Sequence, residues 1–569
     1  MIGAELMARA IERQGVRTVF GLPGHLESFF GALQDRNLRL IHMRHESAVV
    51  LAADGYARAR RGIGVACVTA GPGLANALGG LAAVYEACVP LLLICGRNPA
   101  YLAETAALQE LDHPRAARPF TKWAQTVHDP SRLGEYIDMA CRVALAGRPG
   151  PVLLDVPRDL AEAKVDAAIA AESLAPLVRV PRALADPAAI QRAADLLEQA
   201  KRPLVVAGSG AYWGAAGAGL RTLAHEHRMP VVAKSPARGL VSEDGRIGFS
   251  WPIANLGTRA ADVVLVAGAR LGSPISYAAP PYFDEHARFI QVDIDAAEIG
   301  RSRRIEVPVA GDCGPALEAI ARELLERRYA PRDPGWLGAA LAERMARIDA
   351  AGRDEDGLVH PLRMARELAA RMPAGSIFVG DGANCLNWYK GILQVREPGL
   401  WMDHEPFGSM GVGLPFAIGA MAAEQESAAP RPVFLGTGDG ALGQYVAELS
   451  SAALHRLPIF IMLANDASWG ASREIALRLF GGTYGTDLVH SRYDLVARGL
   501  DCHGELARTP AEVGPAFERA LAAVRAGKPA LVNVLVDRES SGALRREPLL
   551  QMVPFNEAWH AARCRIPGH

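Results

Sequence analysis

Two Gly-Asp-Gly triplets, centred on Asp381 and Asp439, each follow a short apolar run. Counting 27 residues on from Asp439 reaches Asp466, which follows the next apolar run, whereas the same count from Asp381 reaches Gly408, which has no side-chain ligand. Carboxylates at the ends of neighbouring strands suit a hard cation such as Mg²⁺, which prefers oxygen ligands. The second triplet therefore predicts a metal site, with two unrelated strand-end turns as the alternative.

The second triplet and Asn465-Asp466 resemble the thiamin diphosphate motif, in which Gly-Asp-Gly is followed at a fixed interval by Asn-Asn or Asn-Asp. The resemblance implies that Mg²⁺ holds the cofactor's diphosphate here, with the carboxylates of Asp439 and Asp466 and the Ser468 carbonyl as metal ligands. The usual second ligand in the family is asparagine, so Asp466 adds a negative charge. A helix beginning near Ala441 would direct its N-terminus at the phosphates. The remaining cofactor contacts implied by the resemblance are Gly438, Gly440, Ala441, Trp469 and Gly470.

Two further segments carry the same resemblance. In HEPFGSMGVGLPFAIGA, at 404–420, Met410 matches the residue that wedges between the cofactor's two rings, and the Gly408 carbonyl matches the acceptor of its aminopyrimidine. In RHES, Glu46 matches the glutamate that hydrogen-bonds the pyrimidine N1′ and activates the cofactor by proton transfer. In the family these segments come from two subunits, so the resemblance implies a homodimer with shared active sites, commonly paired into a homotetramer.

The chain is similar along nearly its whole length to the acetolactate synthase/decarboxylase superfamily. VTAGPG, TKWAQTV, GSMGVG and NDASWGAS resemble benzaldehyde lyase, whose relatives cleave 2-hydroxy ketones into aldehydes and run the reverse ligation. The resemblance implies that Gln109, 63 residues beyond Glu46, bonds the substrate hydroxyl. It also implies that His25 exchanges the hydroxyl proton, a task that suits imidazole. The turn at His25 is one residue shorter than the lyase's, and loop positions without a catalytic role are the alternative for both residues.

Two neighbouring branches of the superfamily stay open. An acetolactate synthase decarboxylates a 2-keto acid before ligation and usually carries FAD in its central domain, whereas a 2-hydroxyacyl-CoA lyase uses that domain for the ADP part of CoA. No flavin or phosphate fingerprint is complete here; Arg270, Asp293 and Arg303 are candidates for touching such a nucleotide, with surface charges as the alternative. Retention of all the motif residues disfavours a catalytically silent relative, and no Gly-x-Gly-x-x-Gly follows the first strand to indicate a dinucleotide oxidoreductase.

These residues need elements that position them, and three blocks of the chain alternate short aliphatic runs with helical patterns. That alternation is typical of parallel sheets with crossover helices, so it predicts an α/β fold with three doubly wound domains. We expect a pyrimidine-binding domain over 1–165, a central domain over 183–330 and a pyrophosphate-binding domain over 357–540, the first and third with similar layouts. Residues 541–569 are expected to form a C-terminal tail or lid.

Composition limits the partners. The 569 residues include 61 Lys+Arg and 62 Asp+Glu, and a net charge of −1 offers no bulk attraction to nucleic acid or an anionic membrane. The eight cysteines form no CxxC pair and several lie in apolar runs, which indicates reduced thiols and a cytoplasmic setting. The N-terminal residues read as an amphipathic helix, and no apolar run approaches a membrane span. The sequence predicts a soluble enzyme with a small carbonyl substrate.

Overall fold

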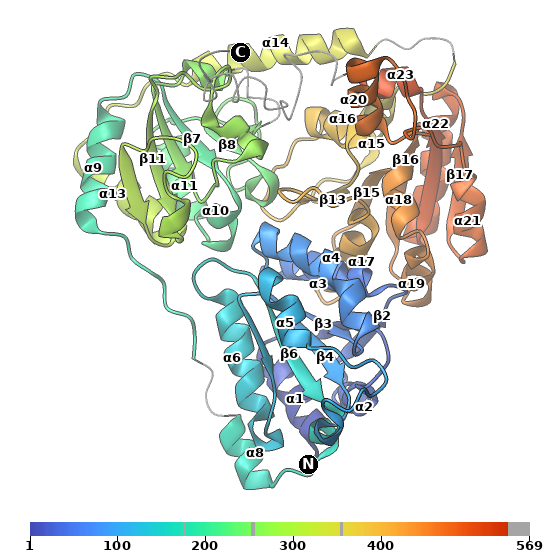
Figure 1. Cartoon of the computed structure of the whole chain (residues 1–569). Coiled ribbons are helices and arrows are strands. Elements are labelled where there is room, and N and C mark those ends of the chain that lie inside the picture. Colours follow the sequence, from blue (N-terminus) through green and yellow to red (C-terminus); the bar gives the residue numbers. More distant parts are fainter. Residues whose placement is uncertain (175–177, 252–256, 353–356, 544–569) are drawn as a thin grey trace.

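The computed structural model of the chain describes residues 1–174, 178–251, 257–352 and 357–543. It contains three six-stranded sheets whose strands pair in parallel, each covered by helices, which confirms the predicted α/β fold. In Figure 1 the first domain lies at the bottom, the central domain at the upper left and the third at the upper right. The domain boundaries predicted above stay predictions, and the sheets themselves span 18–157, 203–310 and 377–535.

The first domain has the strand order β2-β1-β3-β4-β6-β5. Its strands are β1 (Thr18–Gly21), β2 (Arg39–His42), β3 (Gly64–Val68), β4 (Leu91–Arg97), β5 (Trp123–Thr126) and β6 (Pro151–Pro157). Its helices are α1 (Gly3–Arg13), α2 (Glu27–Asp35), α3 (Glu46–Arg60), α4 (Pro72–Ala87), α5 (His113–Ala117), α6 (Leu133–Leu145), α7 (Arg158–Glu162) and α8 (Ala167–Ser173). Helix α1 is the amphipathic helix expected from the N-terminal sequence, with its apolar side buried.

The third domain repeats this topology, because its order β14-β13-β15-β16-β18-β17 matches that of the first strand for strand. Its strands are β13 (Ile377–Gly380), β14 (Trp401–Asp403), β15 (Val433–Gly438), β16 (Ile459–Asn465), β17 (His503–Ala507) and β18 (Ala530–Leu535). Its helices are α15 (Pro361–Arg371), α16 (Asn384–Ile392), α17 (Gly413–Glu424), α18 (Asp439–Gln444), α19 (Glu448–Leu454), α20 (Gly470–Phe480), α21 (Tyr493–Gly499), α22 (Pro510–Arg525) and α23 (Arg538–Ser541).

The central domain has the order β12-β11-β10-β7-β8-β9, so the chain reverses direction across the sheet between β7 and β10. Its strands are β7 (Pro203–Ala207), β8 (Val231–Ala233), β9 (Gly248–Ser250), β10 (Val263–Ala267), β11 (Arg288–Asp293) and β12 (Val307–Ala310). Its helices are α9 (Pro187–Glu198), α10 (Ser209–Trp213), α11 (Gly217–His225) and α13 (Cys313–Glu326). A long helix that the sequence did not predict, α14 (Gly335–Ala351), crosses from this domain towards the third at the top of Figure 1.

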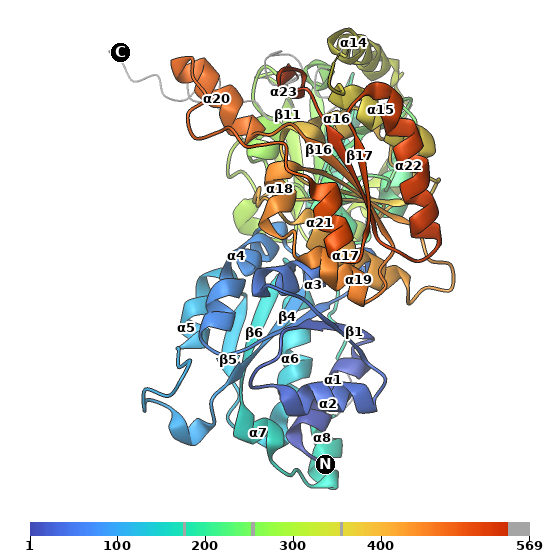
Figure 2. The ribbon, with the colours of Figure 1, turned by 90° about the vertical axis from the view of Figure 1, so that its right-hand side faces the viewer.

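Helices α3 and α17 occupy corresponding places in the two matching domains and pack against each other. A Cβ on Gly419 would lie 1.9 Å from the Ala52 carbonyl oxygen, and one on Gly55 would lie 2.3 Å from that of Phe416. The helices therefore approach so closely that only glycine fits at either position. One apolar core runs through the third domain and across α3 and α4, so the first and third domains form a continuous body, seen from the side in Figure 2.

The cysteines and the helices bear on two expectations drawn from composition, namely reduced thiols and no membrane span. Seven cysteines fall within the described residues, and all seven are buried with free thiols. Among the same residues, no helix combines the length and the apolarity that crossing a bilayer needs. The expected tail or lid at 541–569 lies almost entirely outside the described residues, since only 541–543 belong to them.

Candidate active site

Asp439 and Asp466 lie side by side at the carboxyl ends of β15 and β16, the two strands at the middle of the third sheet. Both side chains are buried. Asp466 Oδ1 accepts from the Ser468 amide at 3.1 Å and from its hydroxyl at 2.9 Å, and Oδ2 accepts from the Ser541 hydroxyl at 2.6 Å. Asp439 Oδ2, by contrast, is buried with no hydrogen-bond partner in the described part of the chain.

The charge of one carboxylate disfavours ionisation of the other. Burial, and next the charge of Asp466, raise the pKa of Asp439 to about 7. Two adjacent buried carboxyl groups, one of them with an unsatisfied oxygen, form a donor set that suits a small divalent cation with oxygen ligands. The residues present therefore fit Mg²⁺.

All ten residues predicted to contact the cofactor line one cavity of about 290 Å³ in the third domain. The ten are Gly408, Met410, Gly438, Asp439, Gly440, Ala441, Asp466, Ser468, Trp469 and Gly470. Helix α18 begins at Asp439, two residues earlier than the sequence suggested. The cavity depends on its glycines, because a Cβ on Gly470 would lie 2.4 Å from Asn384 Nδ2 and one on Gly440 would lie 2.8 Å from the Trp469 ring.

The aspartate of the first Gly-Asp-Gly triplet supports the backbone. Asp381 Oδ1 accepts from the Gly382 amide at 2.6 Å, and Oδ2 accepts from the Gly413 amide at 2.8 Å. Asp381 is buried, and burial raises its pKa. Its carboxyl group therefore anchors the start of α17 and, with it, the loop that carries Gly408 and Met410.

His404 lines the same cavity and was not singled out from the sequence. Its Nε2 lies 3.3 Å from the Gly382 carbonyl oxygen, to which it donates. Its Nδ1 is buried and has no partner among the described residues. The ring therefore offers one unused nitrogen beside the residues predicted to hold the cofactor. The sequence offered one signal for His404, which is its position four residues before Gly408.

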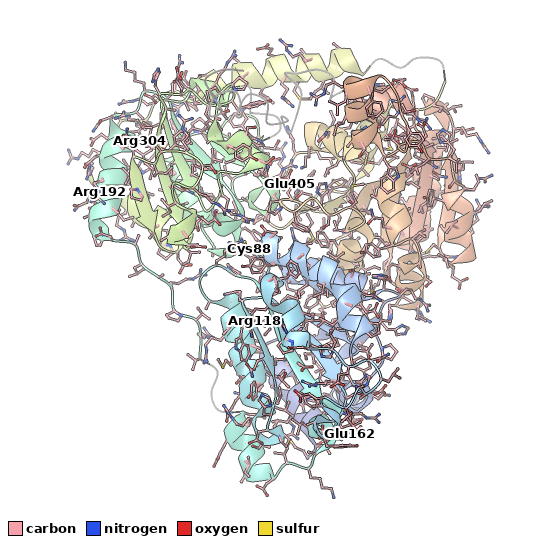
Figure 3. The ribbon with its side chains drawn as sticks, viewed as in Figure 1. Cys88, Arg118, Glu162, Arg192, Arg304 and Glu405 are labelled. Atoms are coloured by element: carbon pink, nitrogen blue, oxygen red, sulfur yellow. The ribbon has the colours of Figure 1, made fainter. Side chains whose placement is uncertain are left out.

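The next residue, Glu405, joins the central and third domains, and Figure 3 labels it between them. Its carboxylate contacts Lys390 Nζ at 2.6 Å and Lys234 Nζ at 2.9 Å. These two ion pairs lower the pKa of Glu405 against the effect of its burial. Lysines of the central and third domains therefore both hold the start of the loop that leads to Gly408.

The three predicted catalytic residues each lie against the turn at residues 69–73, which joins β3 to α4 and includes the first two residues of α4. His25 follows β1, and its Nδ1 lies 2.9 Å from Thr69 Oγ1 while its Nε2 lies 3.2 Å from Asn98 Oδ1. A Cβ on Gly71 would lie 2.6 Å from the Gln109 carbonyl oxygen, and one on Gly73 would lie 3.8 Å from Glu46 Oε1. His25 is thus half-buried and bonded through both ring nitrogens, despite its shortened turn.

Glu46 is the first residue of α3, and the third domain holds the backbone in front of it. Glu46 Oε2 accepts from Asn76 Nδ2 at 3.1 Å. The buried Glu448 carboxylate accepts from the backbone amides of Arg44 and His45 at 3.0 to 3.1 Å. Glu448 was not predicted either.

Within one chain the two groups of residues stay apart. Every described residue lining the third-domain cavity lies between 382 and 472, so none comes from the first domain. Glu46, His25 and Gln109 lie on the first domain, each against a residue of the segment 69–73. The described part of one chain therefore holds two separate groups of predicted site residues.

A further cavity of about 370 Å³ lies where the central sheet reverses direction, with residues that follow β7, β8 and β10 in its wall. Open α/β sheets commonly bind ligands at such a reversal. Arg270 lines this cavity and contacts Glu86 of α4 at 3.0 Å. Asp293 and Arg303 are not among the residues that line it. Arg303 donates instead to carbonyls at 284, 285 and 287, so of the three nucleotide candidates only Arg270 is placed at the cavity.

Comparison with known proteins identifies all three domains. Residues 1–116 match the N-terminal TPP binding domain of thiamine pyrophosphate enzymes, residues 190–320 match their central domain, and residues 381–534 match their C-terminal TPP binding domain. TPP, thiamine pyrophosphate, is thiamin diphosphate. The family predicted from the motifs is confirmed.

Individual relatives agree with the family assignment. A probable acetolactate synthase of Mycobacterium bovis is 33% identical over 543 residues, covering 94% of this chain and 96% of the relative. The 2-hydroxyacyl-CoA lyase 1 of Homo sapiens is 27% identical, with 95% of each chain covered. A thiamine diphosphate-dependent 4-hydroxybenzoylformate decarboxylase of Rhodococcus jostii shares the fold, with a TM-score of 0.81, 24% identity, and coverage of 94% of this chain and 99% of that one. The chain belongs to the thiamin diphosphate-dependent enzymes of the acetolactate synthase/decarboxylase family.

Proposed function

We propose that this enzyme is a thiamin diphosphate- and Mg²⁺-dependent lyase and carboligase that cleaves and forms 2-hydroxy ketones from aldehydes. The observation that carries the proposal is the cluster of Glu46, His25 and Gln109 at one turn. The imidazole of His25 and the side-chain amide of Gln109 are groups that suit a substrate whose hydroxyl must lose and regain a proton. A benzaldehyde lyase-like reaction makes that demand.

The roles follow from the residue types. When bound, thiamin diphosphate supplies the carbon nucleophile and the electron sink. Asp439, Asp466 and the Ser468 carbonyl would hold Mg²⁺, and Glu46 would hold a proton at the pyrimidine N1′. His25 would move the proton of the substrate hydroxyl, which Gln109 would orient.

The active form in this proposal is a homodimer in which the first domain of one subunit completes the cavity of the other, with a homotetramer as a pair of such dimers. Two observations support it. The two groups of predicted site residues line no common cavity within the described part of one chain, and exposed apolar side chains lie close to both groups in sequence. Tyr101 and Leu108 flank the loop of Gln109, Phe407 precedes Gly408, and Phe480 and Tyr484 follow the Asp466 loop in sequence, and all five are exposed. An association that covers these side chains would remove their apolar surface from water.

A second candidate function takes a CoA thioester or a 2-keto acid as substrate. The central cavity and Arg270 favour it, since the ADP part of CoA or of FAD would suit a crevice at the reversal of a parallel sheet. The names of the relatives, acetolactate synthase and 2-hydroxyacyl-CoA lyase, point the same way. Under this candidate the third-domain site keeps its roles, and only the acyl donor changes.

The test incubates the purified enzyme, with thiamin diphosphate and Mg²⁺, separately with benzoin, pyruvate and a 2-hydroxyacyl-CoA, and measures the products by chromatography. Benzaldehyde released from benzoin supports the proposal; acetolactate from pyruvate by a flavin-coloured protein, or cleavage of the CoA substrate alone, overturns it in favour of the second candidate.

Two variants test the assignment of residues. His25→Ala should bind the cofactor normally and lose about 10²-fold or more in lyase turnover. Glu46→Gln should lose turnover with every substrate. Glu162→Gln is the matched control, because Glu162 pairs with Arg158 on α7 at the opposite end of the first domain from α4, as Figures 2 and 3 show. Unchanged turnover of Glu46→Gln with bound cofactor would refute the proton role.

A further inference from the structure

A buried histidine lies beneath the turn at which the three predicted catalytic residues meet. His113, the first residue of α5, receives the Gly71 backbone N–H at its Nε2, at 2.9 Å. Its Nδ1 lies 2.8 Å from Asp155 Oδ1 on β6. His113 and Asp155 are both buried.

The partners determine the tautomer of the ring. A backbone amide can only donate, so Nε2 must be the acceptor, and the proton must sit on Nδ1 and be donated to Asp155. The other oxygen of Asp155 accepts from Thr126 Oγ1 at 2.8 Å and from Arg97 at 3.0 Å. The charge of Asp155 is therefore compensated, and the ring is fixed in orientation from strands β4, β5 and β6.

Cys95, His113 and Asp155 have the spacing of a metal site, but their ligand atoms are already engaged. Ligand atoms of Cys95, His113 and Asp155 all lie within 4.8 Å of one another. Both ring nitrogens are already used, however, and both oxygens of Asp155 are engaged. Burial raises the pKa of the Cys95 thiol far above its usual range, so it stays protonated and donates to the Thr69 carbonyl at 3.5 Å. The cluster is a hydrogen-bonded support.

The turn that His113 supports is closely packed against the three predicted catalytic residues. Gly71 has a φ of +55°, in the region that favours glycine, and its Cα faces the backbone of Gln109 so closely that no side chain fits between them. Thr69 on the same turn contacts the His25 ring, and Gly73 faces the Glu46 carboxylate. A shift of the Gly71 amide would therefore displace parts of the backbone against which all three predicted catalytic residues lie.

We propose that His113 and Asp155 are positioning residues for the reaction: they fix the turn at 69–73 through the Gly71 amide, and thereby the places of Gln109, His25 and Glu46. This inference rests on the proposed function of those three residues. His113 itself touches no substrate. Its contribution is to keep their spacing within the tolerance that catalysis requires.

The test compares His113→Leu with His113→Gln. Leucine removes the acceptor, whereas glutamine offers a carbonyl oxygen to Gly71 and an N–H to Asp155. His113→Leu should lower kcat by roughly 10²-fold while the dissociation constant of thiamin diphosphate changes little, because displacement of catalytic groups by about 1 Å costs about that much. His113→Gln should restore most of the loss. His286→Leu, at an exposed position, is the matched control.

Hydrogen–deuterium exchange provides a readout other than activity. In protein shown by circular dichroism to be folded, a peptide containing Gly71 should exchange faster in His113→Leu and at the wild-type rate in His113→Gln. Full kcat in His113→Leu, or a glutamine variant as impaired as the leucine variant, would overturn the positioning role. Wild-type protein without thiamin-dependent turnover would instead overturn the proposed function, so the two failures are distinguishable.

Discussion

Glu448 in the third domain accepts the backbone N–H of Arg44 in the first, at 3.0 Å to Oε1 and 3.1 Å to Oε2. His45 donates to the same carboxylate, and Ser451 completes its hydrogen bonding at 2.8 Å. Because α3 begins at Glu46, a buried carboxylate from another domain holds the two residues that precede the predicted activating glutamate.

Glu448→Gln should therefore both destabilise the protein and impair activation of the cofactor. Its amide nitrogen cannot accept the Arg44 and His45 amides, and losing a buried hydrogen bond to a charged group costs about 2 kcal/mol. Urea unfolding measures the first effect, and turnover at saturating thiamin diphosphate measures the second. Glu518→Gln is the control: Glu518 forms an exposed pair with Arg371, so its loss should cost below about 1 kcal/mol. Equal stability of the two variants would contradict the prediction.

Metal binding should depend on pH because of Asp439. In the metal-free protein its pKa is raised from 3.8 to about 7. Between those values the folded state holds a proton that the unfolded chain has lost, so the free energy of unfolding should fall as pH rises towards 7 and level off above. Mg²⁺ needs the ionised carboxylate, so its affinity should rise about tenfold per pH unit below 7 and then level off.

Calorimetric titration of Mg²⁺ in the presence of thiamin diphosphate measures this dependence. Asp466→Asn is the informative comparison, because it removes the neighbouring charge while keeping an oxygen ligand. Its Mg²⁺ affinity should level off at a lower pH than that of the wild type. An affinity that is constant across the neutral range in both proteins would refute the charge argument.

Shared active sites should show subunit complementation. Glu46→Gln and Asp439→Asn homodimers should each be inactive, yet a heterodimer of the two, purified through different tags, holds one site with both native residues. It should recover turnover. A heterodimer of Glu46→Gln and His25→Ala is the control: both changes lie in the first domain, so each site keeps one defect and activity should stay low. Recovery in the control, or none in the test pair, argues against sharing.

Gly470→Ala should close part of the cofactor cavity without unfolding the domain. The new methyl group would lie 2.4 Å from Asn384 Nδ2 and 3.2 Å from Asp466 Oδ2. We expect weaker binding of thiamin diphosphate, measured by fluorescence quenching, with little change in the melting temperature. Gly31→Ala in α2 has no atom within 4 Å of the new methyl group and should bind the cofactor normally. Normal binding by Gly470→Ala would show that the cofactor lies elsewhere.

Much of this architecture could be predicted from local sequence. The aliphatic runs gave the parallel sheets, because buried parallel strands read as continuous apolar segments. The residues spaced around the second Gly-Asp-Gly triplet were predicted to share a site and do line one cavity, since the carboxyl ends of adjacent parallel strands meet at one edge. The 27-residue interval between Asp439 and Asp466 is the length of chain that leads from the end of β15, through the crossover helices, to the end of β16.

The residues that were missed act across long sequence separations. Nothing local distinguishes Glu448 from an ordinary helix-start acid, because its partners are about 400 residues away. His113 reads as a loop histidine until β6 brings Asp155 beneath it. Helix α14 follows a Pro- and charge-rich stretch at 327–334, a composition typical of a connector, and its buried side chains pack into cores formed by other segments.

The first and third domains have matching strand orders, but they differ in which domain supplies the carboxyl group that supports one corresponding helix. In both, a helix starts after the second strand, and a buried carboxyl group receives backbone amides at or just before its first turn. For α17 that group is Asp381, from the same domain; for α3 it is Glu448, borrowed from the other. The carboxyl group at the start of α17 thus belongs to the domain that it supports. In the first domain, the place of the glutamate predicted to activate the cofactor depends in part on how the third domain packs against it.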